Sequence, residues 1–327
     1  MKILESLFGS LARLSAAVDP SSDLEIHAEP IDGHEWARLA VGNHSVAILL
    51  PASLDSSVPK QDLEHIAIDP RATYQVRSDG SLRNEVVSIV ATKSKDGWLI
   101  TTFLELVAML LQSVPRNRPE EVEKLIQDLV SLFRTLVQPA TKTTQGLWGE
   151  LFLIRRSADV DLAVESWHTL PNDRYDFSHD RERIEAKTTT GPRVHTFGHL
   201  QLLPVAGLRV TIASMVLLPS TDGPTCSDLV SQIAVRLKSD ALRNILVKQV
   251  VRTLGNQWQN QGGTRFDPDH ASAALKFYDV HSVPRIDGAI PAEVSGISYQ
   301  SDLQLAKELY ADEVDAAAPL TRALMDV

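Results

Sequence analysis

The sequence predicts a mixed α/β fold (α+β), because the spacing of apolar residues changes more than once along the 327-residue chain. Residues 20–95 read as short strands separated by turn signals. Residues 98–158 change to helical spacing, with apolar residues three and four positions apart. Strands return near residue 174, and a further helical region follows them. We therefore expect sheets and helices that form one large domain or two smaller ones.

The N-terminal section combines one helix with several strands. Residues 1–18 carry apolar side chains at helical spacing, interrupted by Glu5 and Arg13. This pattern is typical of an amphipathic docking helix and not of a secretory signal. No catalytic constellation occurs in the section, so it could be a DNA-reading module, a partner-docking module or a β-rich cap. The strands expected here are 25–27, 36–41, 45–50, 74–77 and 86–91.

Three helices are expected next, at 103–111, 119–137 and 143–156. The third is the informative one, because Glu150 falls within the apolar stripe formed by Leu147, Leu151 and Ile154. A buried carboxylate is costly unless it is paired. Two interpretations of Glu150 are therefore open: a metal ligand, or a salt bridge to an arginine beneath the core.

Two short strands follow at 174–178 and 183–191, with a polar turn between them. Side chains alternate between the two faces of a strand, so Glu185 and Lys187 share one face while Ile184 and Ala186 fill the other. If the strands pair as a hairpin, Asp176 joins Glu185 and Lys187. Two carboxylates and an ammonium group stabilise a core poorly. They suit a divalent cation better, because magnesium prefers oxygen ligands.

Asp176, followed nine residues later by Glu185-Ala186-Lys187, resembles the signature of the PD-(D/E)XK nucleases. Residues 146–151 resemble the glutamate-bearing helix that often precedes this signature, and 195–202 and 209–214 resemble the next two core strands. The chain is similar to one group in particular, bacterial family members often encoded beside restriction and phage-defence genes. The resemblance extends from about residue 60 to residue 310. It departs from the pattern at Tyr175, where the proline of the motif is missing.

The resemblance implies a restriction-endonuclease-like core, in which helices flank a mixed central sheet. It also implies a metal-dependent endonuclease that hydrolyses the phosphodiester bonds of DNA. The implied cofactor is Mg²⁺, for which Mn²⁺ can substitute. Asp176, Glu185, the carbonyl of Ala186 and, at the edge, Glu150 would hold the ion.

Three further residues receive roles from the same resemblance. Lys187 would orient the attacking water or stabilise charge on the phosphorane. Gln201 matches a glutamine that the family tends to carry after its third strand, and His195 lies near the start of that strand. For these two residues the alternatives are a satisfied polar side chain and a surface histidine.

The implied partners are DNA and a helicase or methyltransferase of the same defence system, and a homodimer is left open. The alternative function is a non-catalytic DNA-binding or interaction subunit of a defence complex that retains the nuclease fold. The intact Asp176, Glu185 and Lys187 argue against a subunit that has lost activity. The sequence carries no phosphate loop, nucleophile elbow or His-Glu-x-x-His helix.

The net charge argues against strong DNA binding by the chain alone. The net charge is −10, whereas DNA-binding proteins usually present a basic surface. From residue 234 to residue 253, however, five bases stand against one acid, within a helical region expected at 227–254. From residue 302 to residue 327, six acids stand against two bases. The whole-chain charge therefore conceals a local asymmetry.

The sections expected are a helix and β-rich part (1–96), a nuclease-like core (97–260) and C-terminal strands with an acidic helical tail (261–327). Further strands are expected at 275–280 and 294–299. No run of about eighteen uncharged apolar residues occurs, so no membrane span is expected. The single cysteine, Cys226, excludes an internal disulfide and fits a cytoplasmic protein.

Overall fold

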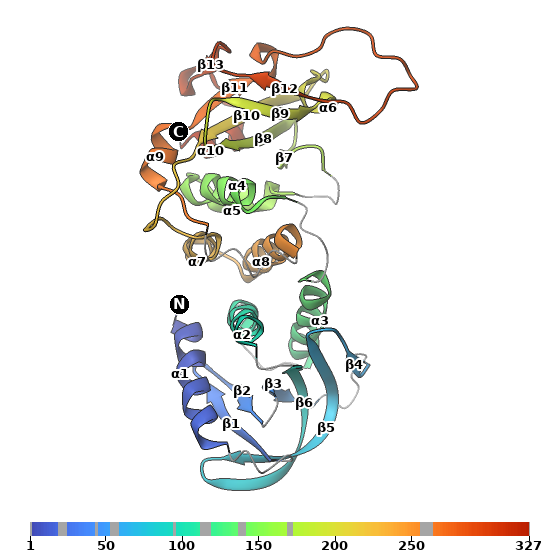
Figure 1. Ribbon diagram of the computed structural model, residues 1–327, viewed down its shortest axis with the longest axis vertical. Coiled ribbons are helices and arrows are strands. Elements are labelled where there is room, and N and C mark those ends of the chain that lie inside the picture. The colour runs from blue at the N-terminus through green and yellow to red at the C-terminus, as the bar shows by residue number, and fades with distance from the viewer. Residues whose placement is uncertain are drawn as a thin grey trace. The chain divides into compact units, whose positions relative to one another are not determined.

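The computed structural model describes residues 2–18, 25–42, 45–52, 59–93, 96–111, 119–136, 142–168, 173–255 and 264–326. They belong to two compact units, Met1–Pro139 and Ala140–Val327 (Figure 1). Each unit has its own sheet, and each is described by itself. The division into three sections, with boundaries after residues 96 and 260, stays a prediction.

The strands of the first unit close into a small barrel. β1 pairs with β2 on one side and, in parallel, with β5 on the other, so β1, β2, β3, β6 and β5 form a ring. Alternate side chains such as Ile26, Val76 and Ile89 fill its interior. Closure pairs the strand edges that an open sheet would expose. The strands are β1 (Glu25–Ile31), β2 (His34–Val41), β3 (Val46–Pro51), β4 (Gln61–Asp62), β5 (Ile66–Ser78) and β6 (Ser81–Thr92).

Three helices complete this unit: α1 (Lys2–Ala17), α2 (Gly97–Leu111) and α3 (Pro119–Leu136). α1 packs on β1, β2 and α2, with Leu7 and Leu14 buried at that contact face. α3 contacts α2 and β3. The amphipathic N-terminal helix, both later helices and the five expected strands are confirmed, although the strand expected at 74–77 is only part of the longer β5.

A mixed sheet forms the centre of the second unit, in the order β13-β11-β10-β8-β7. β8 runs parallel to β10 and antiparallel to β7. In Figure 1 the helices α4 and α5 lie between this sheet and a second helical layer, α7 and α8. The strands are β7 (Phe177–His179), β8 (Glu182–Thr189), β10 (Arg209–Val216), β11 (Lys276–Asp279) and β13 (Glu308–Leu309). The helices are α4 (Thr144–Arg156), α5 (Val160–Ser166), α7 (Cys226–Arg236) and α8 (Asp240–Leu254).

This layering confirms the predicted mixed sheet flanked by helices, and it explains the character of α4. Eight consecutive residues of α4, from Leu147 to Ile154, are buried, because the helix has neighbours on both sides. The sequence pattern predicts an apolar stripe there, whereas nearly the whole helix surface is covered. Thr143 caps the helix by accepting a hydrogen bond from the Gly146 N–H.

A short segment expected to be a core strand packs on the mixed sheet, where Phe197 and Leu202 share a buried cluster with Val210 and Ile212 of β10. The expected strand 195–202 is wrong in its second half: β9 (Val194–Gly198) ends and a helical turn, α6 (His199–Leu202), begins. Gln201 accepts a hydrogen bond from the Gly198 N–H at 3.0 Å, which stabilises that turn. β9 pairs with β12 (Ser298–Asp302) and not within the five-stranded sheet. The strand expected at 294–299 therefore begins four residues later.

Glu165 and Ser166 end α5, whose N-terminus is capped by Asp159. One other expectation needs correction. The helical region 227–254 is broken between Arg236 and Asp240, where Ser239 caps α8. Its basic residues therefore do not line a single helix.

Several of these basic residues bind other parts of the chain. Arg236 donates to the carbonyls of Arg155 and Ser157, at the end of α4. Lys238 pairs with Asp161 at 3.1 Å, and Arg243 donates to the carbonyls of Ala234 and Leu237. These contacts favour a structural role for this stretch over a phosphate-facing surface.

The C-terminal helix α10 (Pro319–Met325) is attached to the start of β8. The buried carboxylate of Glu182 accepts hydrogen bonds from the N–H groups of Leu320 and Thr321 and from the Thr321 hydroxyl, at 2.7–3.0 Å. Short helices α9 (Pro268–Ala273), Val280–Ser282 and Ala311–Glu313 complete the unit. Among the residues described, no helix has the length and apolar character needed to cross a membrane.

Candidate active site

The candidate site lies where β7 stops pairing with β8. Phe177 is paired with Ile184, and Asp176 is the residue immediately before this pair. Beyond it the edge of β8 is no longer paired with β7, and the Asp176 side chain takes over: its Oδ2 accepts the N–H of Ala186 at 2.8 Å. The expected hairpin thus brings Asp176 to the middle of β8, but the first strand, expected at 174–178, begins only at Phe177, so Asp176 precedes it.

Glu185 and Lys187 project from the same face of β8, as expected. The Lys187 Nζ lies 2.8 Å from Glu185 Oε1, and the Gln201 Nε2 donates to the same oxygen at 2.8 Å. Lys187 also lies over the ring of Phe197, 5.1 Å from its centroid, a cation–π contact. The second oxygen, Glu185 Oε2, is buried and has no hydrogen-bond partner in the described part of the chain.

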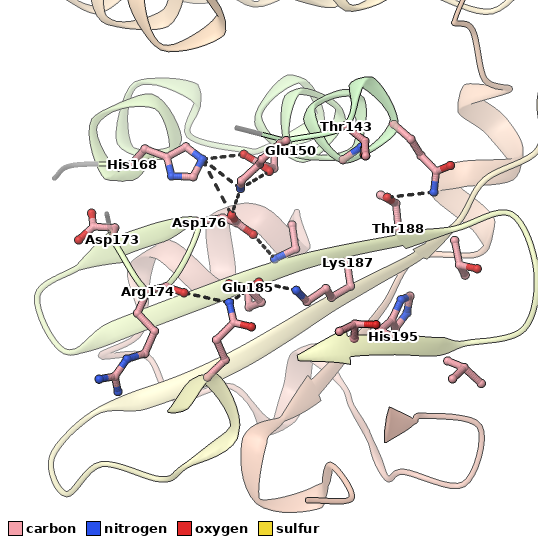
Figure 2. Close-up of a pocket in the computed structure, with 18 of the residues that line it drawn as sticks. Thr143, Glu150, His168, Asp173, Arg174, Asp176, Glu185, Lys187, Thr188 and His195 are labelled. Atoms are coloured by element: carbon pink, nitrogen blue, oxygen red, sulfur yellow. Dashed lines mark hydrogen bonds and ion pairs between the residues drawn. The ribbon is translucent and has the colours of Figure 1, made fainter. Parts of the chain in front are cut away.

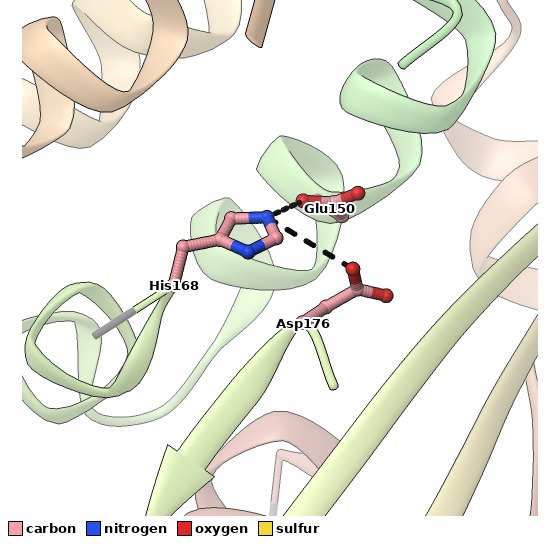
Figure 3. A group of neighbouring side chains, drawn as sticks. All are labelled: Glu150, His168 and Asp176. Atoms are coloured by element: carbon pink, nitrogen blue, oxygen red, sulfur yellow. Dashed lines mark hydrogen bonds and ion pairs between the residues drawn. The ribbon is translucent and has the colours of Figure 1, made fainter. Parts of the chain in front are cut away.

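Glu150 reaches the site from the other face of β8, on helix α4. The helix approaches closely because residue 149 is glycine: a Cβ atom there would lie 2.3 Å from the Thr188 Cγ2. Glu150 is 2% exposed, and its Oε2 lies 2.9 Å from His168 Nε2 and accepts the indole N–H of Trp167 at 2.8 Å. Figure 3 shows Glu150, His168 and Asp176 turned toward one another.

Lys142 connects these groups. Its Nζ lies 2.6 Å from Glu150 Oε1 and 3.3 Å from His168 Nε2, and it forms an ion pair with Asp176 Oδ1. The salt-bridge interpretation of Glu150 is therefore correct in kind, but the partner is a lysine and not an arginine. The metal interpretation stays a prediction.

One cavity of about 700 Å³ is lined by Lys142, Glu150, His168, Asp176, Glu185 and Lys187 together. In Figure 2, Glu150 and His168 lie on the helix side of the strand, while Lys187 and His195 lie on the other side. The cavity therefore extends across the β8 edge. Its lining residues are Lys142, Thr143, Gln145, Gly146, Glu150, His168, Asp173, Arg174, Asp176, Glu185, Ala186, Lys187, Thr188, Thr189, Thr190, Val194, His195, Thr196 and Gln201.

The three carboxylates differ in protonation because their neighbours differ. Burial raises the pKa of Glu185 to about 8, and the nearby charge of Asp176 acts in the same direction. Burial and the charge of Glu150 raise the pKa of Asp176. Burial also acts to raise the pKa of Glu150, but Lys142 and His168 outweigh it and lower that pKa to about 2. Without a bound cation, Glu150 therefore carries a negative charge near neutral pH, whereas Glu185 is largely protonated.

The two residues with open alternatives have definite positions. Gln201 links the site to the segment before it, since its Nε2 also donates to the Arg174 carbonyl at 3.0 Å. His195 is buried at 4% exposure and lies 2.8 Å from the Ser214 hydroxyl, so it is not a surface histidine. Burial, with Lys187 and Arg193 nearby, lowers the pKa of His195 to about 4.

Three residues of the site could not be predicted from the sequence: Lys142, Trp167 and His168. Lys142 precedes the cap of α4 and His168 follows α5. Neither lies on a recognisable motif, and only the packing of α4 and α5 brings both to Glu150. The one available signal is Trp167-His168, a bulky aromatic next to a titratable ring shortly before Asp176.

The donor set fits a divalent cation. Ligand atoms of Glu150, His168 and Asp176 all lie within 4.8 Å of one another. The unpartnered Glu185 Oε2 adds a buried oxygen in the same cavity. Carboxylate oxygens with one imidazole nitrogen suit ions of the Mg²⁺ and Mn²⁺ type, so this group could hold a metal ion.

Comparison with protein families decides the relationship. The model of a family named DUF4420 and described as "Putative PD-(D/E)XK family member" matches residues 12–304. The chain belongs to this family. The match to the PD-(D/E)XK family begins within α1 and includes the barrel, so the barrel is a part of the family pattern and not an addition to it. No curated protein and no solved structure matches the chain.

Membership of this PD-(D/E)XK family agrees with the fold of the second unit and indicates a nuclease-like protein. The family match ends at residue 304, before α10. Asp176 and Glu185-Ala186-Lys187 of β8, the residues that resemble the family signature, line the cavity described above.

Proposed function

We propose that the chain is a metal-dependent endonuclease that hydrolyses phosphodiester bonds of DNA, with Mg²⁺ as the ion and Mn²⁺ as a substitute. The observation that carries the proposal is that Asp176, Glu185, Lys187 and Glu150 all line one cavity. This set would be a poor choice for stability alone, because three carboxylates are buried in it. Family membership supports the same reaction class.

Asp176, Glu185 and Glu150 would hold the ion, with the Ala186 carbonyl as a further donor. A bound divalent ion supplies Lewis acidity and a more acidic water. Lys187 has three donors on a compact charge, and Glu185 and Phe197 hold it in place. It would orient the attacking water and stabilise charge on the phosphorane. Gln201 fixes the Glu185 carboxylate and would keep one of its oxygens turned toward Lys187.

The charge of the chain bears on its partners. The net charge is −10, and several basic side chains of the stretch 234–253 bind other parts of the chain. We therefore infer that a partner contributes most of the affinity for DNA. A helicase or methyltransferase of a restriction or phage-defence system, in the cytoplasm, is the partner that the family resemblance suggests. The barrel is the surface we assign to that contact.

The alternative function is a non-catalytic subunit that retains the fold. A plasmid-nicking assay separates the two: the purified chain is incubated with supercoiled DNA in Mg²⁺, in Mn²⁺ and in EDTA. We expect metal-dependent nicking that Asp176→Ala abolishes and that Lys187→Ala lowers by a factor on the order of hundreds. Lys238→Ala, which removes a surface lysine paired with Asp161, is the matched control and should cut like wild type.

Nicking by Lys187→Ala within a few-fold of wild type would remove the role assigned to Lys187. No cleavage under any condition, even with candidate partner proteins added, would favour the non-catalytic subunit.

A further inference from the structure

Lys142 occupies the centre of the Glu150–His168–Asp176 group. Its ammonium is within ion-pair distance of both carboxylates, at 2.6 Å from Glu150 Oε1 and in direct contact with Asp176 Oδ1. It is also 3.3 Å from His168 Nε2. The ligand atoms of the three partners are the ones that could hold a metal ion. The atoms that could hold a metal ion therefore already contact a monovalent cation, the Lys142 ammonium.

The ammonium and its partners differ in how firmly they are held. The side chains of Glu150 and Asp176 are 2% and 6% exposed, whereas that of Lys142 is 30% exposed. Glu150 comes from a buried helix, and Asp176 is tied to the Ala186 N–H. Lys142 lies outside α4, one residue before the cap Thr143. Its long stem can therefore leave the group while the carboxylates stay in place.

Two cations cannot share this position. A unit charge and a divalent ion about 4 Å apart repel each other by several kcal/mol, even when the effective dielectric constant is about 20. The ammonium also contacts Glu150 Oε1 and Asp176 Oδ1, while Trp167 donates to Glu150 Oε2, so the ion and the ammonium would compete for the same carboxylate oxygens.

We propose that Lys142 is a tethered cation that pairs with both Glu150 and Asp176 in the metal-free protein, and that a divalent ion displaces it when it binds. This inference rests on the metal site proposed above. The ligand class is a divalent cation that accepts carboxylate oxygen and imidazole nitrogen, such as Mn²⁺ or Mg²⁺. The displaced ammonium stays at the same cavity, which Lys187 and Arg174 also line and where a phosphate group would meet it.

The arrangement has a thermodynamic consequence that a purely structural salt bridge does not have. Lys142 stabilises the empty site but competes with the ion, so removing its charge should change metal-free stability and metal affinity in opposite directions. A structural salt bridge predicts that both decrease, because the pocket would lose its shape.

The test compares wild type with Lys142→Met and Lys142→Arg, and with Lys238→Met as the control that removes a remote lysine of an exposed pair. Each protein is stripped with EDTA and then titrated with Mn²⁺ alone by calorimetry. Thermal unfolding is measured in EDTA. We expect Lys142→Met to unfold at lower temperature without metal and to bind Mn²⁺ about tenfold more tightly or better.

Lys142→Arg keeps the charge and should bind Mn²⁺ no more tightly than wild type, while Lys238→Met should match wild type in both measurements. If Lys142→Met is unfolded in EDTA, its refolding is titrated with Mn²⁺, and Lys142→Gln is measured as a smaller change. Recovery of the fold by Mn²⁺ supports displacement.

The two proposals fail in different ways. Equal or weaker Mn²⁺ binding by Lys142→Met and Lys142→Gln, with normal binding by wild type, overturns the role of Lys142 and leaves the proposed nuclease intact. Absence of Mn²⁺ and Mg²⁺ binding by every protein overturns the metal site itself, and the displacement with it.

Discussion

At the scale of single residues, two glutamates of the site are equally buried but differ in pKa. Glu150 and Glu185 are both buried, yet the pKa of Glu150 falls to about 2 and that of Glu185 rises to about 8. The difference arises because Lys142 and His168 outweigh burial at Glu150, whereas at Glu185 burial and the nearby charge of Asp176 outweigh Lys187. One oxygen of Glu185 also has no hydrogen-bond partner among the residues described. Glu150 therefore contributes a fixed negative charge, and Glu185 is the group that a cation would ionise.

Glu150→Gln should destabilise the metal-free protein. The change removes one of the two carboxylates that Lys142 and His168 face and leaves only Asp176. Loss of one partner of a buried ion pair costs about 3–5 kcal/mol. Denaturant unfolding in EDTA measures it. Glu308→Gln, which removes a partly exposed pair with Lys276, is the control and should change the free energy of unfolding by under about 1 kcal/mol. Unchanged stability of Glu150→Gln would mean that these contacts contribute little.

His195 should make the protein sensitive to acid. Its folded-state pKa of about 4 lies below the ordinary value of 6.5, so below pH 6.5 the unfolded chain binds a proton that the folded protein does not. Stability is complete above pH 6.5 and is lost as the pH falls toward 4, by up to about 3 kcal/mol. His195→Asn should flatten this part of the stability profile, measured by denaturant unfolding between pH 4 and 7. An equally steep loss in the variant would assign it to other groups.

At the scale of elements, the distance between α4 and β8 sets the position of Glu150. Gly149→Ala would place a methyl group 2.3 Å from Thr188 Cγ2 and 3.0 Å from Met215 Cε, and such overpacking typically costs about 1–3 kcal/mol. We expect lower thermal stability and weaker Mn²⁺ binding, because α4 must move away from the strand with Glu150. Gly97→Ala, where the added Cβ has no atom within 4 Å, is the control.

A second substitution makes this prediction specific. Thr188→Ser removes the Cγ2 that the new methyl group would meet and keeps the hydroxyl that accepts a hydrogen bond from Gln145. Gly149→Ala combined with Thr188→Ser should regain much of the lost stability and Mn²⁺ affinity. If the double variant were as impaired as Gly149→Ala alone, the close approach at Thr188 would not be the cause.

The elements also show which features the sequence could predict. The hairpin of β7 and β8 is local, so strand alternation suffices to place Glu185 and Lys187 on one face. Glu150 is found because a charge interrupts an apolar stripe. β9 is predicted too long, because Gly198 and Gln201 form a cap that alternation does not reveal. Lys142 and His168 are missed, because they meet only through the packing of α4 and α5.

At the scale of the whole molecule, the charge predicts weak binding of DNA by the chain alone. Each neutralised phosphate contributes through counterion release, and a protein of net charge −10 with an acidic site offers few bases for it. We expect a dissociation constant well above nanomolar in physiological salt and a shallow dependence on salt concentration. Fluorescence anisotropy with duplex DNA over a salt series measures both. Nanomolar binding with a steep salt slope would remove the need for a partner.

The attachment of α10 to Glu182 has a practical consequence for anyone who trims the chain to its family limits. A protein that ends at residue 304 would lack α10, and the buried Glu182 carboxylate, 2% exposed, would lose all three donors that bind it. Glu182 begins the strand that carries Glu185 and Lys187, so the shortened chain should express poorly and unfold at markedly lower temperature than the full chain. Glu182→Gln in the full chain should show part of the same loss. If the shortened protein melted like the full one, α10 could be discarded, and the boundary at 304 would be a sound place to cut.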